Sequence, residues 1–179
     1  MTMSLLERFE VAPQPKRQSD VLALLSEMRN SPFIGEISAD EIADLLRANS
    51  VLFFYDGDTL AALAGWEVIH APWVEVGPFY TAKAYRGQGL GSFVFDTVEE
   101  IQRDTGHKLY GVTKNPLVKR MFARRGYHQV RVWRLPRAIQ RHLLRKLTLR
   151  KLLRHVRKLR FGDSVSHFVK SDRRDDAGK

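Results

Sequence analysis

The sequence predicts an α/β domain with a mixed central sheet and flanking helices, and three observations support this fold class. Signals for strands and for helices alternate along most of the chain. A glycine-rich turn over residues 84–92 links an expected strand to an expected helix. A leucine-rich, basic segment near the C-terminus has the pattern of an amphipathic helical appendage. The length of 179 residues suits one domain with its own core.

Signals for a strand, two helices and a β-hairpin fill the first half of the chain. Residues 5–11 have the character of a strand. A first helix, capped by Ser19-Asp20, is predicted by apolar residues at i, i+3, i+4 and i+7, namely Val21, Leu24, Leu25 and Met28. Ser38 and Glu41 have the spacing of a capping box for a second helix. Residues 51–55 and 60–69 then flank the hairpin turn Asp56-Gly57-Asp58.

The second half continues the alternation. Residues 73–81 form a strand that Gly77-Pro78 interrupts, which predicts a bulge or a splay because proline removes a ladder donor. A helix runs from the glycine-rich turn to about Thr105, with Phe93, Val94, Val98 and Ile101 as its apolar residues. A strand over 108–113, a helix opened by Asn115-Pro116 with Leu117, Met121 and Phe122 on its apolar side, and a strand over 127–135 follow. The order is β-α-α-β-β-β-α-β-α-β.

The glycine-rich turn has the features of a pyrophosphate cradle. Glycines allow close backbone approach to a phosphate, and the N-terminus of the following helix favours an anion. A P-loop is excluded because Gly91 is not followed by Lys-Ser or Lys-Thr. The dinucleotide fingerprint is excluded because Gly89 and Gly91 are separated by one residue, not two.

The turn and a second block carry a resemblance to a known family. Arg86 to Gly91 reads Arg-x-x-Gly-x-Gly, which resembles the acyl-CoA pyrophosphate loop of the GNAT N-acetyltransferase superfamily. Asn115 to Tyr127 is similar to the second conserved block of that superfamily, and the order of elements is that of the GNAT fold. Together they cover about residues 5–135. The resemblance implies a splayed fourth strand, acetyl-CoA as co-substrate and a primary amine as acceptor.

The resemblance also implies which residues hold the donor. Phe79, Tyr80 and Thr81 on the fourth strand would pair with pantetheine and polarise the thioester. Asn115 would contact the pantetheine arm. The pyrophosphate would lie on the loop residues, which are Arg86, Gly87, Gln88, Gly89, Leu90, Gly91 and Ser92.

Glu75 is the expected general base. It occupies the position at which histone-type members of the superfamily carry a catalytic glutamate. Its strand neighbours are apolar, and burial among them would favour the neutral acid over the carboxylate, as a base working near pH 7 requires. The alternative is an exposed strand glutamate paired with a lysine.

The proton donor to the leaving thiolate is less directly indicated. Where the superfamily often has a tyrosine, this chain has Phe122, which cannot donate a proton. Tyr110 stands where some members carry a glutamate on the fifth strand, and it is the expected catalytic acid. Tyr80 or water are alternatives, and either tyrosine could instead be a core residue with a satisfied hydroxyl.

The net charge of +10 is concentrated in one segment. Residues 137–160 contain ten Lys or Arg and no acid, whereas the rest of the chain holds 20 basic and 20 acidic residues. The leucines of this segment change face at Thr148, which predicts two helices or one bent helix. A solvated helical face explains the leucines but not the one-sided charge. RNA or another polyanion is therefore the expected partner, with an anionic membrane surface as the alternative.

The sequence argues against disulfides, metal sites and membrane spans. The chain has no cysteine, so disulfides and thiolate sites are excluded, and a cytoplasmic location is the default. No metal site is expected, because the six histidines are scattered. His70, His107 and His128 fall at element ends and are expected on the surface. No apolar run is long enough to span a membrane.

The sequence therefore predicts four parts. Residues 1–135 form an acyl-CoA-binding GNAT core, 136–160 a basic helical insert, 161–170 the last strand and 171–179 a disordered tail. The expected function is acetyl-CoA-dependent N-acetyl transfer to a protein amine, an aminoacyl-tRNA or a small molecule, with a homodimer left open. The alternative is a GNAT-like module without efficient catalysis that binds acyl-CoA and docks on RNA.

Overall fold

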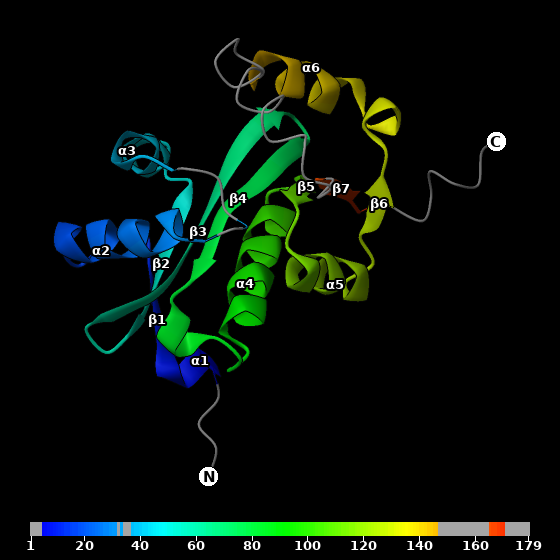
Figure 1. Cartoon of the computed structure of the whole chain (residues 1–179). Coiled ribbons are helices and arrows are strands. Elements are labelled where there is room, and N and C mark those ends of the chain that lie inside the picture. The colour runs from blue at the N-terminus through cyan, green and yellow to red at the C-terminus, as the bar shows by residue number, and fades with distance from the viewer. Residues whose placement is uncertain (1–4, 32, 34–36, 147–164, 171–179) are drawn as a thin grey trace. The chain divides into compact units, whose positions relative to one another are not determined.

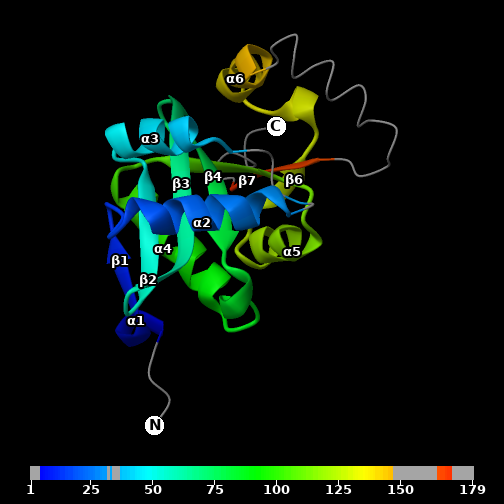
Figure 2. The ribbon, with the colours of Figure 1, turned by 60° about the vertical axis from the view of Figure 1, so that its left-hand side comes forward.

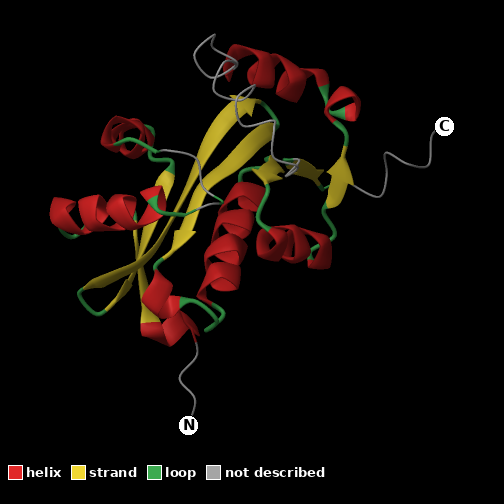
Figure 3. Cartoon of the chain, viewed as in Figure 1, coloured by secondary structure: helices red, strands yellow, loops and turns green. Residues whose placement is uncertain are grey.

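The computed structural model describes residues 5–31, 33, 37–146 and 165–170 (Figure 1). They divide into two compact units, one of Met1–Glu67 with Val76–Thr105 and one of Val68–Glu75 with Gly106–Lys179. The strands are hydrogen-bonded in the order β1-β2-β3-β4-β5-β7-β6. β3, Thr59–His70, and β4, Trp73–Thr81, each pass through both units. The predicted α/β class with a mixed sheet is confirmed (Figure 3).

The first unit begins differently from the prediction. Residues 5–8 form a helical turn, α1 (Leu5–Arg8), and the strand β1 begins only at Phe9 and ends at Ala12. Leu-Leu-Glu-Arg is a run of good helix formers, so local propensity favours the helix. β1 pairs antiparallel with β2, Val51–Asp56. β2 and β3 form the predicted hairpin, in which Asp56 pairs with Thr59.

Helices α2 (Gln18–Arg29) and α3 (Ala39–Arg47) test two predicted caps. The capping box of α3 is confirmed, because Ser38 accepts from the Glu41 backbone and the Glu41 side chain accepts from the Ser38 backbone. The predicted cap of α2 is wrong, since Arg17 is the N-cap and its side chain makes no capping bond. Asp20 instead lies in the first helical turn, where its charge is favourable, and pairs with Arg17.

Helices cover both faces of the sheet in the first unit (Figure 2). On one face α2 and α3 pack on β2, β3 and β4, and the predicted stripe of α2 is fully buried. On the other face lies α4, Leu90–Asp104. Phe93 of α4 meets Phe54 of β2 edge-on, with ring centroids 5.9 Å apart. Because Phe53 and Phe54 are successive strand residues, they face opposite layers, and both are fully buried.

The apolar face of α4 differs in part from the prediction. Val94 and Val98 are buried as expected, but Ile101 is exposed. Leu90, Phe95 and Gln102 supply the remaining buried positions. The helix ends as predicted, with Gly106 in the left-handed conformation at φ 75°.

The second unit contains β5 (Lys108–Thr113), α5 (Pro116–Arg124), β6 (His128–Val130) and β7 (Ser166–Val169). β7 pairs antiparallel with both β5 and β6. The strand predicted over residues 127–135 is therefore mostly wrong. β6 stops at Val130, where its pairing with β7 ends, and Val132–Arg134 form a 3₁₀ turn.

Asn115 caps α5 as predicted, since its side chain accepts from the Leu117 N–H at 2.9 Å. On the predicted apolar side of this helix Phe122 is buried, whereas Leu117 is 64% exposed. Phe122 stacks on Phe168 of β7, with centroids 5.0 Å apart, and covers Gly111 of β5.

Helix α6, Arg137–Lys146, is the first part of the basic segment. Its residue Ile139 is buried against Tyr110 and Leu135, which form a small core within the second unit. The expected second helix, the change of face at Thr148 and the tail over 171–179 lie outside the described residues. Within the described ranges, no helix combines the length and the apolar character that a membrane span needs.

Candidate functional site

The predicted cradle forms the connection between the 3₁₀ turn Lys83–Tyr85 and α4 in the first unit. Gly87 and Gly89 have φ of 76° and 85°, a conformation that glycine adopts without a steric penalty. Gly89 is the N-cap of α4. The backbone N–H groups of residues 87–91 make no hydrogen bond to any other described residue. Five consecutive donors at a helix N-terminus can therefore face an anion.

Two of the amides expected in the cradle are used inside the protein. The N–H of Arg86 donates to the Lys83 carbonyl at 3.3 Å, and that of Ser92 donates to the Gly89 carbonyl at 3.0 Å. The donors available to a ligand are thus centred on the glycines between them.

Side chains brace this loop from both ends. The Arg86 guanidinium donates to the Thr81 carbonyl at 3.1 Å and to the Tyr80 hydroxyl at 2.8 Å. The Gln88 side chain donates to the Ala84 carbonyl and accepts from Arg8, both at 3.0 Å. Because these bonds within the protein hold the loop, they fix the direction of its open amides.

The predicted residues at the end of β4 lie in the same unit. Phe79 packs against Phe95 of α4, with ring centroids 5.8 Å apart. The Tyr80 hydroxyl donates to Glu27 of α2 at 2.9 Å. Burial raises the pKa of Tyr80 to about 12; the Glu27 carboxylate adds to this, and Arg86 opposes it. Tyr80 is therefore a protonated structural bridge, which does not favour it as the alternative acid.

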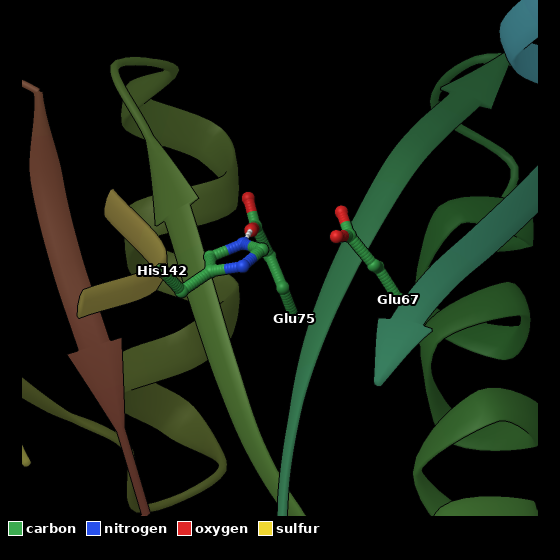
Figure 4. A group of neighbouring side chains, drawn as sticks. All are labelled: Glu67, Glu75 and His142. Atoms are coloured by element: carbon green, nitrogen blue, oxygen red, sulfur yellow. Dashed lines mark hydrogen bonds and ion pairs between the residues drawn. The ribbon is translucent and has the colours of Figure 1, made fainter. Parts of the chain in front are cut away.

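Glu75 lies on the part of β4 that belongs to the second unit, and its surroundings differ from the expected apolar ones. One carboxylate oxygen, Oε2, is 2.6 Å from Nε2 of His142 (Figure 4). The same oxygen is 2.8 Å from Nζ of Lys146. Both partners come from α6. The Glu75 side chain is 15% exposed and that of His142 is 2% exposed. The basic segment thus supplies two partners to the predicted base, and this combines features of both expectations for Glu75.

Tyr110, the expected acid, is fully buried on β5. Its hydroxyl lies 2.6 Å from Nδ1 of His167 on β7. Burial raises the pKa of Tyr110 well above its ordinary value, and the nearby charge of Glu75 adds to this. Burial lowers the pKa of His167, although Glu75 opposes that shift. Both groups are neutral, so the tautomer of His167 decides whether the Tyr110 hydroxyl donates to Nδ1 or Nδ1–H donates to the phenol oxygen.

A pocket of about 180 Å³ lies in the second unit, between the end of β3 and α6. His142 lines it, so the pocket is connected to Glu75 through the hydrogen bond between them.

His142, Lys146 and His167 are the site residues that sequence reasoning missed. His142 follows Ile139 at i+3 and lies within the apolar stripe of α6, and this position predicts burial. That signal was available, but nothing local connects His142 with Glu75, 67 residues earlier. Asn115 is the N-cap of α5 in the structure. Its expected contact with pantetheine stays a prediction.

A model of the acetyltransferase (GNAT) family matches residues 20–127, more than half of the chain. The chain belongs to this family. Both of the blocks that carried the resemblance, the loop at 86–91 and the block at 115–127, lie inside the matched region.

Solved structures support the GNAT fold at low sequence identity. Rv2747 from Mycobacterium tuberculosis, solved with CoA, has a TM-score of 0.67 at 16% identity, over 91% of this chain and 99% of that one. Ard1 from Thermoplasma volcanium has a TM-score of 0.63 at 10% identity, over 92% and 99%. N-acetylglutamate synthase from Neisseria gonorrhoeae, solved with coenzyme A and N-acetyl-glutamate, has a TM-score of 0.67 at 15% identity. The match covers 90% of this GNAT chain but only 34% of the synthase chain. No curated protein matches the chain.

Proposed function

We propose that this GNAT protein transfers an acetyl group from acetyl-CoA to a primary amine. Membership of the acetyltransferase family supports the reaction class, and two neighbours of the same fold were solved with CoA. The observation that carries the proposal is the set of open backbone donors over residues 87–91 at the N-terminus of α4. A cytoplasmic location and a homodimer stay predictions.

The loop would hold the donor through its pyrophosphate. The amides of Gly87, Gly89 and Gly91 would donate to the phosphate oxygens, and the positive end of the α4 dipole would stabilise their charge. The backbone of Phe79 to Thr81 is proposed to pair with the pantetheine arm. Asn115 is proposed to contact the same arm.

Transfer requires a neutral amine. At pH 7 only about one lysine-type amine in 10³ is unprotonated. When the amine nitrogen attacks the thioester carbonyl, a C–N bond forms and the C–S bond breaks. The amine loses a proton to a base, and the departing sulfur gains one from an acid or from water. The protein must therefore supply a proton acceptor close to the amine.

We infer that Glu75 is this base and that α6 positions it. His142 and Lys146 hold Oε2, whereas the other carboxylate oxygen makes no hydrogen bond to a described residue. That second oxygen can accept the amine proton directly. His142 acts as a positioning residue because its buried ring orients the carboxylate.

Tyr110 is the proposed acid. Its hydroxyl is protonated at neutral pH and is oriented by His167, and a proton given up by Tyr110 could be replaced through that imidazole. Phe122 takes no part in proton transfer, since its ring fills the space over Gly111.

The test measures acetyl transfer and CoA binding on the same variants. Replacing Glu75 by Gln keeps the size of the side chain and removes the base, so we expect kcat/KM to fall on the order of 10²- to 10⁴-fold with an unchanged Kd for CoA. The control is Glu100→Gln, an exposed glutamate of α4, which should leave both values unchanged.

Two results would contradict parts of the proposal. Full activity of Glu75→Gln at pH 7 would show that Glu75 is not the base. Tight CoA binding without transfer to any amine would instead favour the binding module without catalysis. RNA binding by the basic segment stays a prediction, and most of that segment lies outside the described residues.

A further inference from the structure

The pocket beside α6 has an unusual set of charges. Ile69 and His70 from the end of β3 form one wall, and the lining is completed by four residues of α6, namely Ala138, Arg141, His142 and Arg145. All six residues belong to the second unit. Four of the six lining side chains can carry positive charge, namely His70, Arg141, His142 and Arg145.

Arg141 and Arg145 are not neutralised by the part of the chain that the structure describes. They lie one helical turn apart, so their side chains share a face of α6. Both are exposed, and neither makes an ion pair or a hydrogen bond with a described residue. Lys146 on the same helix differs, because Glu75 offsets its charge. Two guanidinium groups that have no partner among the described residues and that line one pocket are suited to bind an oxyanion.

His142 links this basic pocket to a negatively charged side chain, that of Glu75. His142 lines the pocket, and its Nε2 atom contacts Glu75, the proposed base. The lining of the pocket thus includes two arginines and a histidine that is hydrogen-bonded to a carboxylate. An acceptor with a cationic amine and an anionic group would match both features.

The size of the pocket favours a small ligand. Its volume of about 180 Å³ is below the range of about 300–1,000 Å³ that is typical of pockets for drug-sized molecules. A compact amine that carries its own oxyanion fits this volume better than an extended acceptor.

We propose that this pocket binds the carboxylate or phosphate of a small amine acceptor, through Arg141 and Arg145, and that it thereby selects acidic amines. The inference rests on the proposed acetyl transfer and specifies its substrate class. The oxyanion would pair with the guanidinium groups while the amine is directed toward Glu75. Arg141 and Arg145 are therefore specificity determinants and not parts of the proton-transfer machinery.

The test uses matched pairs of acceptors that differ in one charge. Standard α-amino acids are compared with their α-carboxamides, and O-phosphoethanolamine with ethanolamine, each with acetyl-CoA and the full chain. We expect the anionic member of at least one pair to have a kcat/KM on the order of tenfold to a hundredfold higher. The two kinds of pair distinguish a carboxylate from a phosphate.

The variant Arg141→Gln/Arg145→Gln should reduce this preference to about one and leave the Kd for CoA unchanged. Arg137→Gln is the matched control, because it removes a charge from the same helix outside the pocket lining. Equal use of both members of every pair, or a preference that survives the double substitution, would overturn the inference.

A binding measurement separates this inference from the proposed function. Calorimetry compares N-acetyl amino acids with their N-acetyl amides in the presence of CoA, which needs no turnover. Tighter binding of the acids, lost in the double variant, supports the pocket even if no amine is acetylated. Equal binding overturns the pocket even if transfer to other amines is observed.

Discussion

Gly89 provides the sharpest test of the proposed CoA-binding loop at residues 86–91. The effect of its backbone conformation on stability and the effect of its proposed phosphate contact on CoA affinity can be measured separately. At φ 85° an alanine would be strained by about 1–2 kcal/mol, so Gly89→Ala should lower the free energy of unfolding by that amount. If the backbone relaxes to avoid the strain, the amide direction changes. Loss of one charge-assisted hydrogen bond to phosphate costs about 1.5–3 kcal/mol, which raises the Kd for CoA about tenfold to a hundredfold.

The control for strain alone is Gly57→Ala. Gly57 lies in the hairpin turn of the same unit, has φ 58°, and has open space around the position of a new Cβ. It should show a similar loss of stability with no change in CoA affinity. Urea unfolding gives the first quantity and titration calorimetry the second. An unchanged Kd for CoA in Gly89→Ala, with the expected loss of stability in both variants, would refute the role of this loop in holding the donor.

Three further predictions concern stability. A Cβ on Gly111 would overlap the Phe122 ring, so Gly111→Ala should destabilise the protein by about 1–3 kcal/mol in urea unfolding. Phe122→Leu in the same chain should recover part of the loss. An unchanged free energy of unfolding in Gly111→Ala would contradict this packing. Ser38→Ala removes the capping bond of α3 and should cost about 1 kcal/mol in the same assay, whereas an exposed serine such as Ser26 should tolerate alanine without loss. The pKa of His167 is lowered by burial, so the unfolded chain binds its proton first as pH falls. The stability that depends on a neutral, buried His167 is therefore fully present above about pH 6.5 and is lost as pH falls below it. His167→Gln should flatten this part of the plot of unfolding free energy against pH. An unchanged plot would show that His167 is not the titrating group.

Features whose cause is local could be predicted from the sequence. The capping box of Ser38 and Glu41, the hairpin turn at Gly57 and the cap at Asn115 each depend on a few neighbouring residues. The strand β4 was predicted with its bounds. The loop at 86–91 also belongs here, because its glycines and the following helix determine its conformation together.

Features that depend on a distant partner were missed or misjudged. β6 ends at Val130, since β7 offers it only a short pairing edge, and alternation within residues 127–135 contains no sign of this limit. Residues 5–8 are a different case, because the strand prediction there was wrong although the local helix propensity of Leu-Leu-Glu-Arg favours the observed helical turn.

The sequence by itself determined the family, the order of most elements and the position of the glycine-rich loop, because these depend on short motifs and periodic patterns. Only the tertiary structure decided the environment of the proposed base. Glu75 is surrounded by apolar residues along its strand, yet its carboxylate contacts His142 and Lys146 from a helix that begins more than 60 residues later. Charges separated by that length of chain interact only when folding brings them within a few ångströms, because water screens them otherwise.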